Sequence, residues 1–340
     1  MNLSEPLNGL LPIDKKSGVF SKDVSRFLQN ILQGIFGKIC LGHIGTLDRL
    51  AEGVLPILIG KATRLQDILL DGVKEYEFDV AFGYETETLD SQSEITRFAE
   101  VHALDNSTIE AALSPFIGDI MQIAPVYSSV RINGIKSYKL ARKPSRKLTL
   151  EQSLELQRHV SVFDLRLLAT YDKSATFSVR CSKGTYVRSL ARDIAQNLNT
   201  LGTVTRLVRH ETALIRKDRC LPFADLQKNP SLWQEFFIPI NRIVSNIAVV
   251  ESLDPTLTAQ LMHGREVILN AEVKDAFIFD FNFEEWLSST TELGKPTQNV
   301  IKKMVLFKDA SLGVIGLANM IEGPGHVATV ISVKLTRSLM

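Results

Sequence analysis

The chain has 340 residues, 45% of them hydrophobic and 23% charged, and a formal net charge of +1. These values are ordinary for a soluble globular protein and allow two domains. No run of about 18 apolar residues occurs, and the first residues lack the basic and apolar segments of a signal peptide, so neither a membrane span nor a leader is expected.

The cysteines and histidines argue against a disulfide framework and against a metal centre. The three cysteines, Cys40, Cys181 and Cys220, are odd in number and far apart. They fit buried thiols in a reducing cytoplasm better than a disulfide framework. The six histidines are scattered without metal-ligand spacing. We therefore expect a cytoplasmic protein without a bound metal.

The first half of the chain alternates helical and extended patterns. Ser21 is placed to cap a helix with apolar residues at helical spacing, and residues 62–70 predict a second, short helix. Residues 76–82 alternate apolar and polar side chains, which predicts a strand with one buried face. Ser107 and Glu110 have capping-box spacing ahead of a helix that should end near Pro115.

The second half predicts a strand over 177–181, followed by a helix that begins at Val187 and ends before Gly202. Strands and helices are mixed without a βαβ rhythm or a glycine-rich nucleotide fingerprint. This favours an α+β fold with a mixed, mostly antiparallel sheet and flanking helices.

The character of the chain changes near residue 245. Short apolar segments at 304–307, 314–318 and 327–333 predict strands of a small β-rich module, and the polar stretch 284–300 predicts an inserted loop. We therefore expect two domains, residues 1–245 and 246–340.

Basic residues are concentrated in two stretches. Seven Lys or Arg residues and no acidic residue occur between Arg131 and Lys147, and residues 175–220 carry nine basic against three acidic residues. Such a distribution suits a polyanion bound on one face, although either stretch alone also fits a solvated surface.

One loop motif carries a candidate catalytic group. Asp48 follows two glycines, a histidine and a threonine in the segment Gly42-His43-Ile44-Gly45-Thr46-Leu47-Asp48. Glycines allow positive φ and close backbone approach, which suits a binding loop. Taken alone, the carboxylate fits a helix or turn cap better than a catalytic role.

Residues 42–53, GHIGTLDRLAEG, resemble the motif around the catalytic aspartate of the TruB-type tRNA pseudouridine synthases. Other segments resemble the same family in the same order. They are Gly9–Gly18, Lys74-Glu75-Tyr76, Gly83 with Thr86–Asp90, Pro125–Arg131 with Gly134, Tyr138 and Ala141-Arg142, and Cys181–Arg188, which reads CSKGTYVR.

The resemblance implies an isomerase that converts uridine to pseudouridine at nucleotide 55 in the T-loop of tRNA, after flipping the base out of its stack. It implies that Asp48 is catalytic, and it assigns an active-site or substrate-binding role to Tyr76, Tyr186, Arg188, Leu207 and His43. The reaction is an isomerisation without redox change, so no cofactor is implied. An arginine beside the aspartate would favour its ionised form and hold its orientation.

The same resemblance implies a pseudouridine-synthase-like catalytic domain over 1–245 and a PUA-like RNA-binding domain over 246–340. It further implies that a basic insertion at about 124–150 holds the T-arm stem-loop. The implied RNA-binding residues are Arg131, Lys136, Lys139, Arg142, Lys143, Arg146, Lys147 and Lys183. We expect a monomer that needs no protein partner.

Single residues also permit structural roles. Tyr76 fits a half-buried core aromatic, Arg188 a partner of Asp193 on its own helix, and His43 a hydrogen-bonded structural residue. Two other functions remain open: a non-catalytic protein that binds or folds tRNA, and the catalytic subunit of a guide-RNA particle.

The chain departs from the family pattern at five positions. Arg49 stands where the motif usually has proline, Glu52 where it has threonine, and Lys16 where the opening turn has proline; Val208 and His210 interrupt an LRRT-like stretch. Glu52 lies four residues after Asp48. At helical spacing, the negative charge of this second carboxylate would favour the protonated form of the first.

Overall fold

The computed structural model describes residues 7–70, 72–102, 104–141 and 154–244, together with five strands nearer the C-terminus. Those strands are β16 (Val249–Ser252), β17 (Glu266–Asn270), β18 (Lys302–Asp309), β19 (Gly313–Ile321) and β20 (Val330–Ser338).

An 11-stranded sheet organises residues 9–239. Its main path runs β14-β1-β3-β12-β4-β11-β10-β7, while β13 pairs with β12, β15 with β1 and β2 with β3. The strands are β1 (Gly9–Lys15), β2 (Leu41–His43), β3 (Glu52–Ile59), β4 (Lys74–Phe82), β7 (Gly118–Ile123), β10 (Gln157–Tyr171), β11 (Ser174–Cys181), β12 (Gly202–Thr212), β13 (Ile215–Arg216), β14 (Leu221–Pro222) and β15 (Ile238–Pro239). Only the β1–β14 and β3–β12 pairs are parallel, so the predicted mixed, mostly antiparallel sheet is confirmed.

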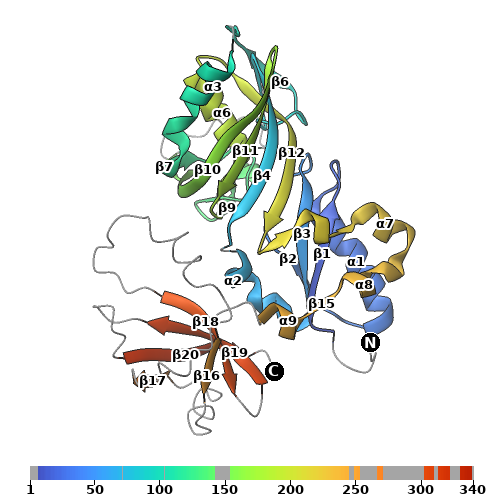
Figure 1. The fold of residues 1–340 in the computed structure, drawn as a ribbon. Coiled ribbons are helices and arrows are strands. Elements are labelled where there is room, and N and C mark those ends of the chain that lie inside the picture. The colour runs from blue at the N-terminus through green and yellow to red at the C-terminus, as the bar shows by residue number, and fades with distance from the viewer. Residues whose placement is uncertain are drawn as a thin grey trace.

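Helices cover two separate parts of this sheet (Figure 1). Helices α3 (Asn106–Leu113) and α6 (Val187–Asn197) lie beside β10 and β11, whereas α1 (Ser21–Phe36), α7 (Phe223–Lys228) and α8 (Trp233–Phe236) gather near β1. The other helices of the described residues are short: η1 (Gly60–Leu65), α2 (Gln66–Leu70), η2 (Ser114–Phe116), α4 (Ser137–Ala141), η3 (Lys217–Arg219), η4 (Pro230–Leu232) and α9 (Ile240–Val244). Two small hairpins form separate two-stranded sheets: β5 (Tyr84–Thr86) with β6 (Ile95–Phe98), and β8 (Arg131–Ile132) with β9 (Ile135–Lys136).

The alternation of β4 produces the core, as the sequence predicts. Every second residue of β4 is buried, and Phe78 stacks on Phe177 of the adjacent strand β11 with ring centroids 5.3 Å apart. Leu190 and Ile194, on one face of α6, belong to the same buried cluster. Apolar burial of this kind is the main stabilising contribution to the fold. Cys181 and Cys220 are buried, whereas Cys40 is exposed, contrary to the expectation of three buried thiols.

Two predicted helix caps are wrong, although the helices themselves are present. Phe20 is the N-cap of α1, and the Ser21 hydroxyl instead donates to the Leu47 carbonyl oxygen over 2.8 Å. Asp105, not Ser107, caps α3 by accepting from the Thr108 N–H. At α3 the carboxylate lies two residues before Ser107, directly ahead of the first helical residue, where it can accept from the free N–H groups.

The five C-terminal strands form a separate sheet in the order β16-β18-β19-β20-β17. The strands predicted around 304–307, 314–318 and 327–333 fall within or overlap β18, β19 and β20. The polar stretch 284–300 lies outside the described residues. None of the helices in the described ranges is long and apolar enough to span a membrane.

Candidate active site

Buried Arg209 of β12 explains the two glycines that flank Asp48. Gly45 (φ +66°) and Gly53 (φ +103°) both have left-handed backbone conformations. A Cβ at Gly45 would lie 3.0 Å from Nη1 of Arg209, and one at Gly53 would lie 2.2 Å from its carbonyl oxygen. The guanidinium donates to the carbonyl oxygens of Val54 and Gly45, each over 2.8 Å. The glycines therefore permit close packing on β12.

Further hydrogen bonds fix the loop on the α1 side. The Ser21 hydroxyl accepts from the Leu47 N–H at 3.0 Å and donates to its carbonyl oxygen, and the Gly18 N–H donates to the Arg49 carbonyl oxygen at 2.8 Å. Asp48 lies between these anchored residues and leaves 40% of its side chain exposed. The loop thus presents a carboxylate on a fixed backbone.

Arg188 brings the second predicted functional group to Asp48. Its Nε lies 2.8 Å from Oδ2 of Asp48, and its side chain is only 5% exposed. This contact is an ion pair, since the Nε–H is not aligned for a hydrogen bond. Nη1 donates to the Thr88 carbonyl oxygen at 2.6 Å and Nη2 to that of Tyr127 at 3.1 Å. Three chain segments therefore converge on one guanidinium.

The alternative partner of Arg188 is wrong, because Asp193 pairs with Arg192 at 2.7 Å. Asp90 is a second carboxylate near Arg188, with Oδ2 at 3.9 Å from Nε. Asp90 is 5% exposed and accepts from the Thr88 hydroxyl over 2.7 Å. The only sequence signal for Asp90 was its place in Thr86–Asp90, a segment that resembles the family.

Gln122 of β7 fixes the start of α6, which carries Arg188. Its Oε1 accepts from the Tyr186 N–H at 2.8 Å, and its Nε2 donates to the Tyr186 carbonyl oxygen at 3.1 Å. Gln122 is 1% exposed. Tyr186 is the N-cap of α6, and its side chain packs against a small cluster that includes Val130 and Leu140. Sequence analysis missed Gln122; a lone polar residue among apolar neighbours was its only signal.

Tyr76 and Leu207 lie on adjacent central strands. Tyr76 of β4 pairs in register with Arg209 of β12, and Leu207 pairs with Phe78. Tyr76 is 8% exposed and Leu207 5% exposed. Burial raises the pKa of the Tyr76 hydroxyl, and the neighbouring Arg209 cation opposes this shift. At neutral pH the hydroxyl is therefore a hydrogen-bond donor.

His43 is tied into the loop through both ring nitrogens. Nδ1 lies 3.3 Å from the Ser25 hydroxyl and Nε2 lies 3.0 Å from the Thr46 hydroxyl. Burial lowers the pKa of His43, and the Arg209 charge lowers it further. The imidazole is therefore neutral and has a hydrogen-bond partner at each nitrogen. This matches the alternative that His43 is a hydrogen-bonded structural residue.

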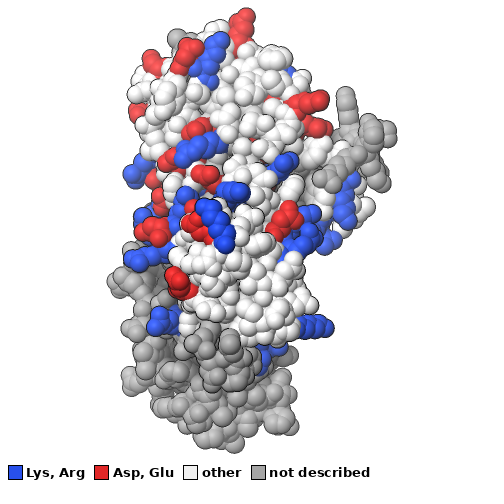
Figure 2. Space-filling view, turned by 90° about the vertical axis from the view of Figure 1, so that its right-hand side faces the viewer, with Lys and Arg blue, Asp and Glu red and all other residues white. Residues whose placement is uncertain are grey.

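The predicted RNA-binding residues are only partly within the described chain. Arg131 and Lys136 lie on the β8–β9 hairpin, Lys139 on α4, and Lys183 in the turn before α6. Arg142, Lys143, Arg146 and Lys147 lie outside the described residues. The face in Figure 2 intersperses Lys and Arg with Asp and Glu, so it shows no continuous area of one sign.

Glu52 does not stand at helical spacing from Asp48, so the condition for its effect on that carboxylate is not met. It is the first residue of β3, and no helix is assigned between the two residues. Gly53, the next residue of β3, packs on the Arg209 backbone.

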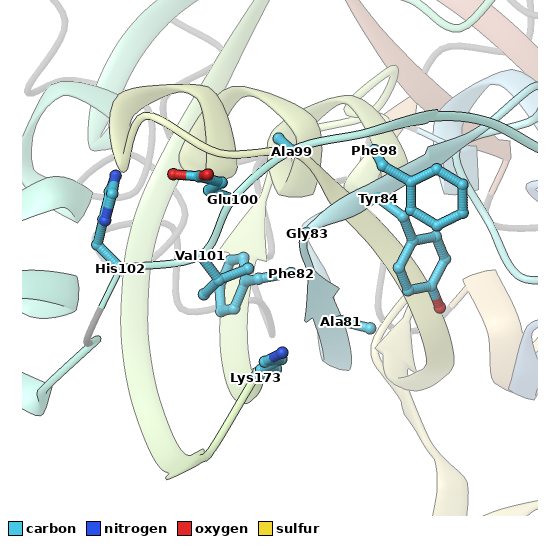
Figure 3. Close-up of a pocket in the computed structure, with 10 residues that line it drawn as sticks. All are labelled: Ala81, Phe82, Gly83, Tyr84, Phe98, Ala99, Glu100, Val101, His102 and Lys173. Carbon is cyan, nitrogen blue, oxygen red and sulfur yellow. The ribbon is translucent and has the colours of Figure 1, made fainter.

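A depression at the other end of β4 is separate from these residues (Figure 3). It is lined by Phe82 and Tyr84 from β4 and β5, by Phe98 to His102, and by Lys173. Six residues of strand separate Phe82 from Tyr76, about 20 Å at the usual rise. No predicted site residue lines this depression. Among the described residues, no group of three His, Cys, Asp or Glu side chains converges as around a metal ion.

The fold of this chain is similar to that of proteins in two solved structures. The chain aligns with a protein in the "Crystal Structure of a Cbf5-Nop10-Gar1 Complex" with a TM-score of 0.67 and 19% identity, covering 98% of this chain and 85% of the other. A protein in the "Structure of H/ACA RNP bound to a substrate RNA containing 2'-deoxyuridine" aligns with a TM-score of 0.64 and the same identity and coverage. At this identity the comparison concerns the fold alone.

Sequence comparison defines the class of enzyme. Residues 34–187 match the TruB family pseudouridylate synthase N-terminal domain. The curated tRNA pseudouridine synthase B of Rickettsia africae (strain ESF-5) is 31% identical over 312 residues, 90% of this chain and 85% of that protein. That of Alkaliphilus oremlandii (strain OhILAs) is 34% identical over 266 residues, 78% and 84% of the two chains. This protein is therefore a pseudouridine synthase. Within that class, the chain belongs to the TruB family.

Proposed function

We propose that this enzyme converts uridine to pseudouridine in the T-loop of tRNA, at nucleotide 55, with Asp48 as the catalytic group. The observation that carries the proposal is the 2.8 Å ion pair between Asp48 and the buried Arg188. The names of the relatives support tRNA as the substrate. The T-loop specificity follows from the resemblance of the motifs.

The proposed chemistry needs an ionised carboxylate at the ribose of the target nucleotide. The bond between N1 of uracil and C1′ breaks, and a bond between C5 and C1′ forms after the base turns; N1 gains a proton and C5 loses one. Asp48 acts either as a nucleophile at C1′ or as the base that removes a ribose proton. Arg188 holds this carboxylate in a fixed orientation.

The target uridine must leave its stack before it can react. We assign Tyr76 to replace the lost stacking with its ring, and Leu207 to line the uracil pocket. The Tyr76 hydroxyl, held protonated by burial, is placed as a donor and proton relay. Tyr186 is assigned to position Arg188 from the start of α6, and His43 to contact the RNA beside the base.

RNA binding is assigned to two further regions. The basic insertion at about 124–150 would hold the T-arm through phosphate contacts, which carry much of nucleic-acid affinity. Residues 246–340 would form a second, PUA-like RNA-binding domain. The separation of β16–β20 from the 11-stranded sheet supports this division near residue 245.

Incubation of the purified protein with an unmodified T-arm stem-loop tests the proposal, with pseudouridine mapped by position. We expect product at the T-loop uridine from the protein alone, as a monomer without a guide RNA or a partner. Absence of product there would overturn the T-loop specificity.

A non-catalytic tRNA-binding or tRNA-folding role is the competing function for the same surface. The Asp48→Asn variant separates the two. We expect it to abolish conversion while the dissociation constant for the stem-loop stays within about threefold of the wild-type value. Appreciable product from this variant would refute the assignment of Asp48.

A further inference from the structure

An exposed aromatic ring lies at the edge of the catalytic loop, beside two cations. Phe20 leaves 47% of its surface exposed. Nζ of Lys22 lies 5.6 Å from the ring centroid, and Cζ of Arg49 lies 5.5 Å from it. Lys22 and Arg49 are themselves exposed. An exposed aromatic ring with two cations over it offers both an apolar face and positive charge at the surface.

This cluster is rigidly connected to Asp48. Residue 49 follows Asp48 directly, and its backbone and side chain are both bonded to Gly18: the Gly18 N–H donates to the Arg49 carbonyl oxygen, and Nε of Arg49 donates to the Gly18 carbonyl oxygen at 3.1 Å. On the other side of Phe20, Ser21 is bonded to Leu47. Phe20 therefore keeps a fixed place relative to the carboxylate.

The ring and the cations match the two parts of a nucleotide. A base stacks on an aromatic face whatever its identity, and a phosphate is attracted to lysine and arginine. In the described part of the chain neither Lys22 nor Arg49 forms an ion pair with Asp48, whose partner is Arg188, so both charges are available to a phosphate. An apolar protein segment could also pack on the ring, but it carries no phosphate that would bind the two adjacent cations.

We propose that Phe20, Lys22 and Arg49 form a stacking platform for a nucleotide that neighbours the target uridine in the RNA. When the RNA binds, the Lys22 and Arg49 side chains move from over the Phe20 ring to the phosphate of that nucleotide, and its base stacks on the ring in their place. The inference rests on the proposed function and adds a substrate contact to it. Arg49 is one of the departures from the family motif, so the platform distinguishes this chain from proteins with proline there.

The experiment measures the single-turnover rate as a function of T-arm stem-loop concentration. We expect Phe20→Ala to raise the apparent dissociation constant about tenfold, a typical loss for one base–aromatic stack, with the larger effect on affinity than on the saturating rate. Phe20→Tyr should restore affinity because it keeps the ring. Arg49→Gln should reduce the slope of log affinity against log salt by about one.

A matched control and a modified RNA make the test specific. Phe98 is 77% exposed and lines the distant depression of Figure 3, so Phe98→Ala should leave affinity unchanged. An abasic nucleotide on one side of the target uridine should weaken binding to the wild type about tenfold, but weaken binding to Phe20→Ala hardly at all.

The outcomes separate the platform from the proposed function. If the wild type neither binds nor converts the stem-loop, the proposed function fails. If the wild type is active and Phe20→Ala matches it, or if no abasic position couples to Phe20, the platform is overturned while the proposed function stands. A similar loss for Phe20→Tyr and Phe20→Ala would also overturn stacking.

Discussion

Nε of Arg188 lies 2.8 Å from Oδ2 of Asp48, and the two side chains differ sharply in exposure: 5% for the arginine and 40% for the aspartate. The guanidinium is thus held inside the protein, while the carboxylate reaches towards solvent. Carbonyl oxygens of Thr88 and Tyr127 fix the other two nitrogens of the guanidinium. The arrangement orients the carboxylate without covering it.

Arg188→Lys should reduce the single-turnover rate by at least about a hundredfold. An ammonium group keeps the charge but cannot span two carbonyl oxygens and a carboxylate in fixed directions. Arg188→Met should reduce activity as much and also lower the unfolding free energy by about 3 kcal/mol, because it leaves buried acceptors unpaired. Rates from rapid quench and urea unfolding curves would check both. Near wild-type activity in Arg188→Lys would contradict a directional role.

Tyr76→Phe should separate stacking from proton transfer. The ring remains, so the dissociation constant for the stem-loop should stay within about twofold of the wild-type value. The reaction should slow, because burial keeps the hydroxyl protonated and available as a donor. Tyr76→Leu should weaken RNA binding as well, by about tenfold. Equal rates for Tyr76→Phe and the wild type would assign Tyr76 to stacking alone.

The sequence predicted elements whose pattern is local. The alternation of β4 and the apolar face of α6 follow from burial of one side, and both are present. The two motifs that carry Asp48 and Arg188 are far apart in the sequence, and the structure brings these side chains into contact. The prediction that Ser21 caps α1 was wrong because its hydroxyl is hydrogen-bonded to Leu47, 26 residues away in the sequence.

Contacts between residues far apart in the sequence could not be predicted from local patterns. The register of β12 against β4 and β3 places Arg209 under Gly45 and Gly53. No spacing in the chain relates residues more than 150 positions apart. The bonds of Gln122 with Tyr186 likewise depend on how β7 meets α6.

Gln122→Leu tests whether this glutamine positions Arg188. Loss of both bonds to Tyr186 should loosen the start of α6 and slow the reaction about tenfold, while the stem-loop is still bound. Asn197→Leu is a control at the other end of the same helix, where Nδ2 donates to the Ala112 carbonyl oxygen at 2.9 Å. Each substitution should cost about 1 kcal/mol of stability. Equal rates for the two variants would show that Gln122 serves stability only.

Lys15→Met should change how stability depends on pH. Burial lowers the pKa of Lys15 from 10.5 to about 8, with the nearby charges of Asp48 and Glu52 acting in the opposite direction. Between about pH 8 and 10.5 the unfolded chain therefore binds more protons at this residue than the folded chain, so its contribution to stability increases with pH.

The comparison has to be made between the variant and the wild type, because other groups titrate in the same range. Burial raises the pKa of Cys181 to about 11, which makes its contribution fall as pH rises above 9. In urea unfolding at pH 7.5 to 9, the wild type should gain stability relative to Lys15→Met, by at most about 1.4 kcal/mol per pH unit. A pH-independent difference between the two proteins would mean that Lys15 is charged in the folded state throughout this range.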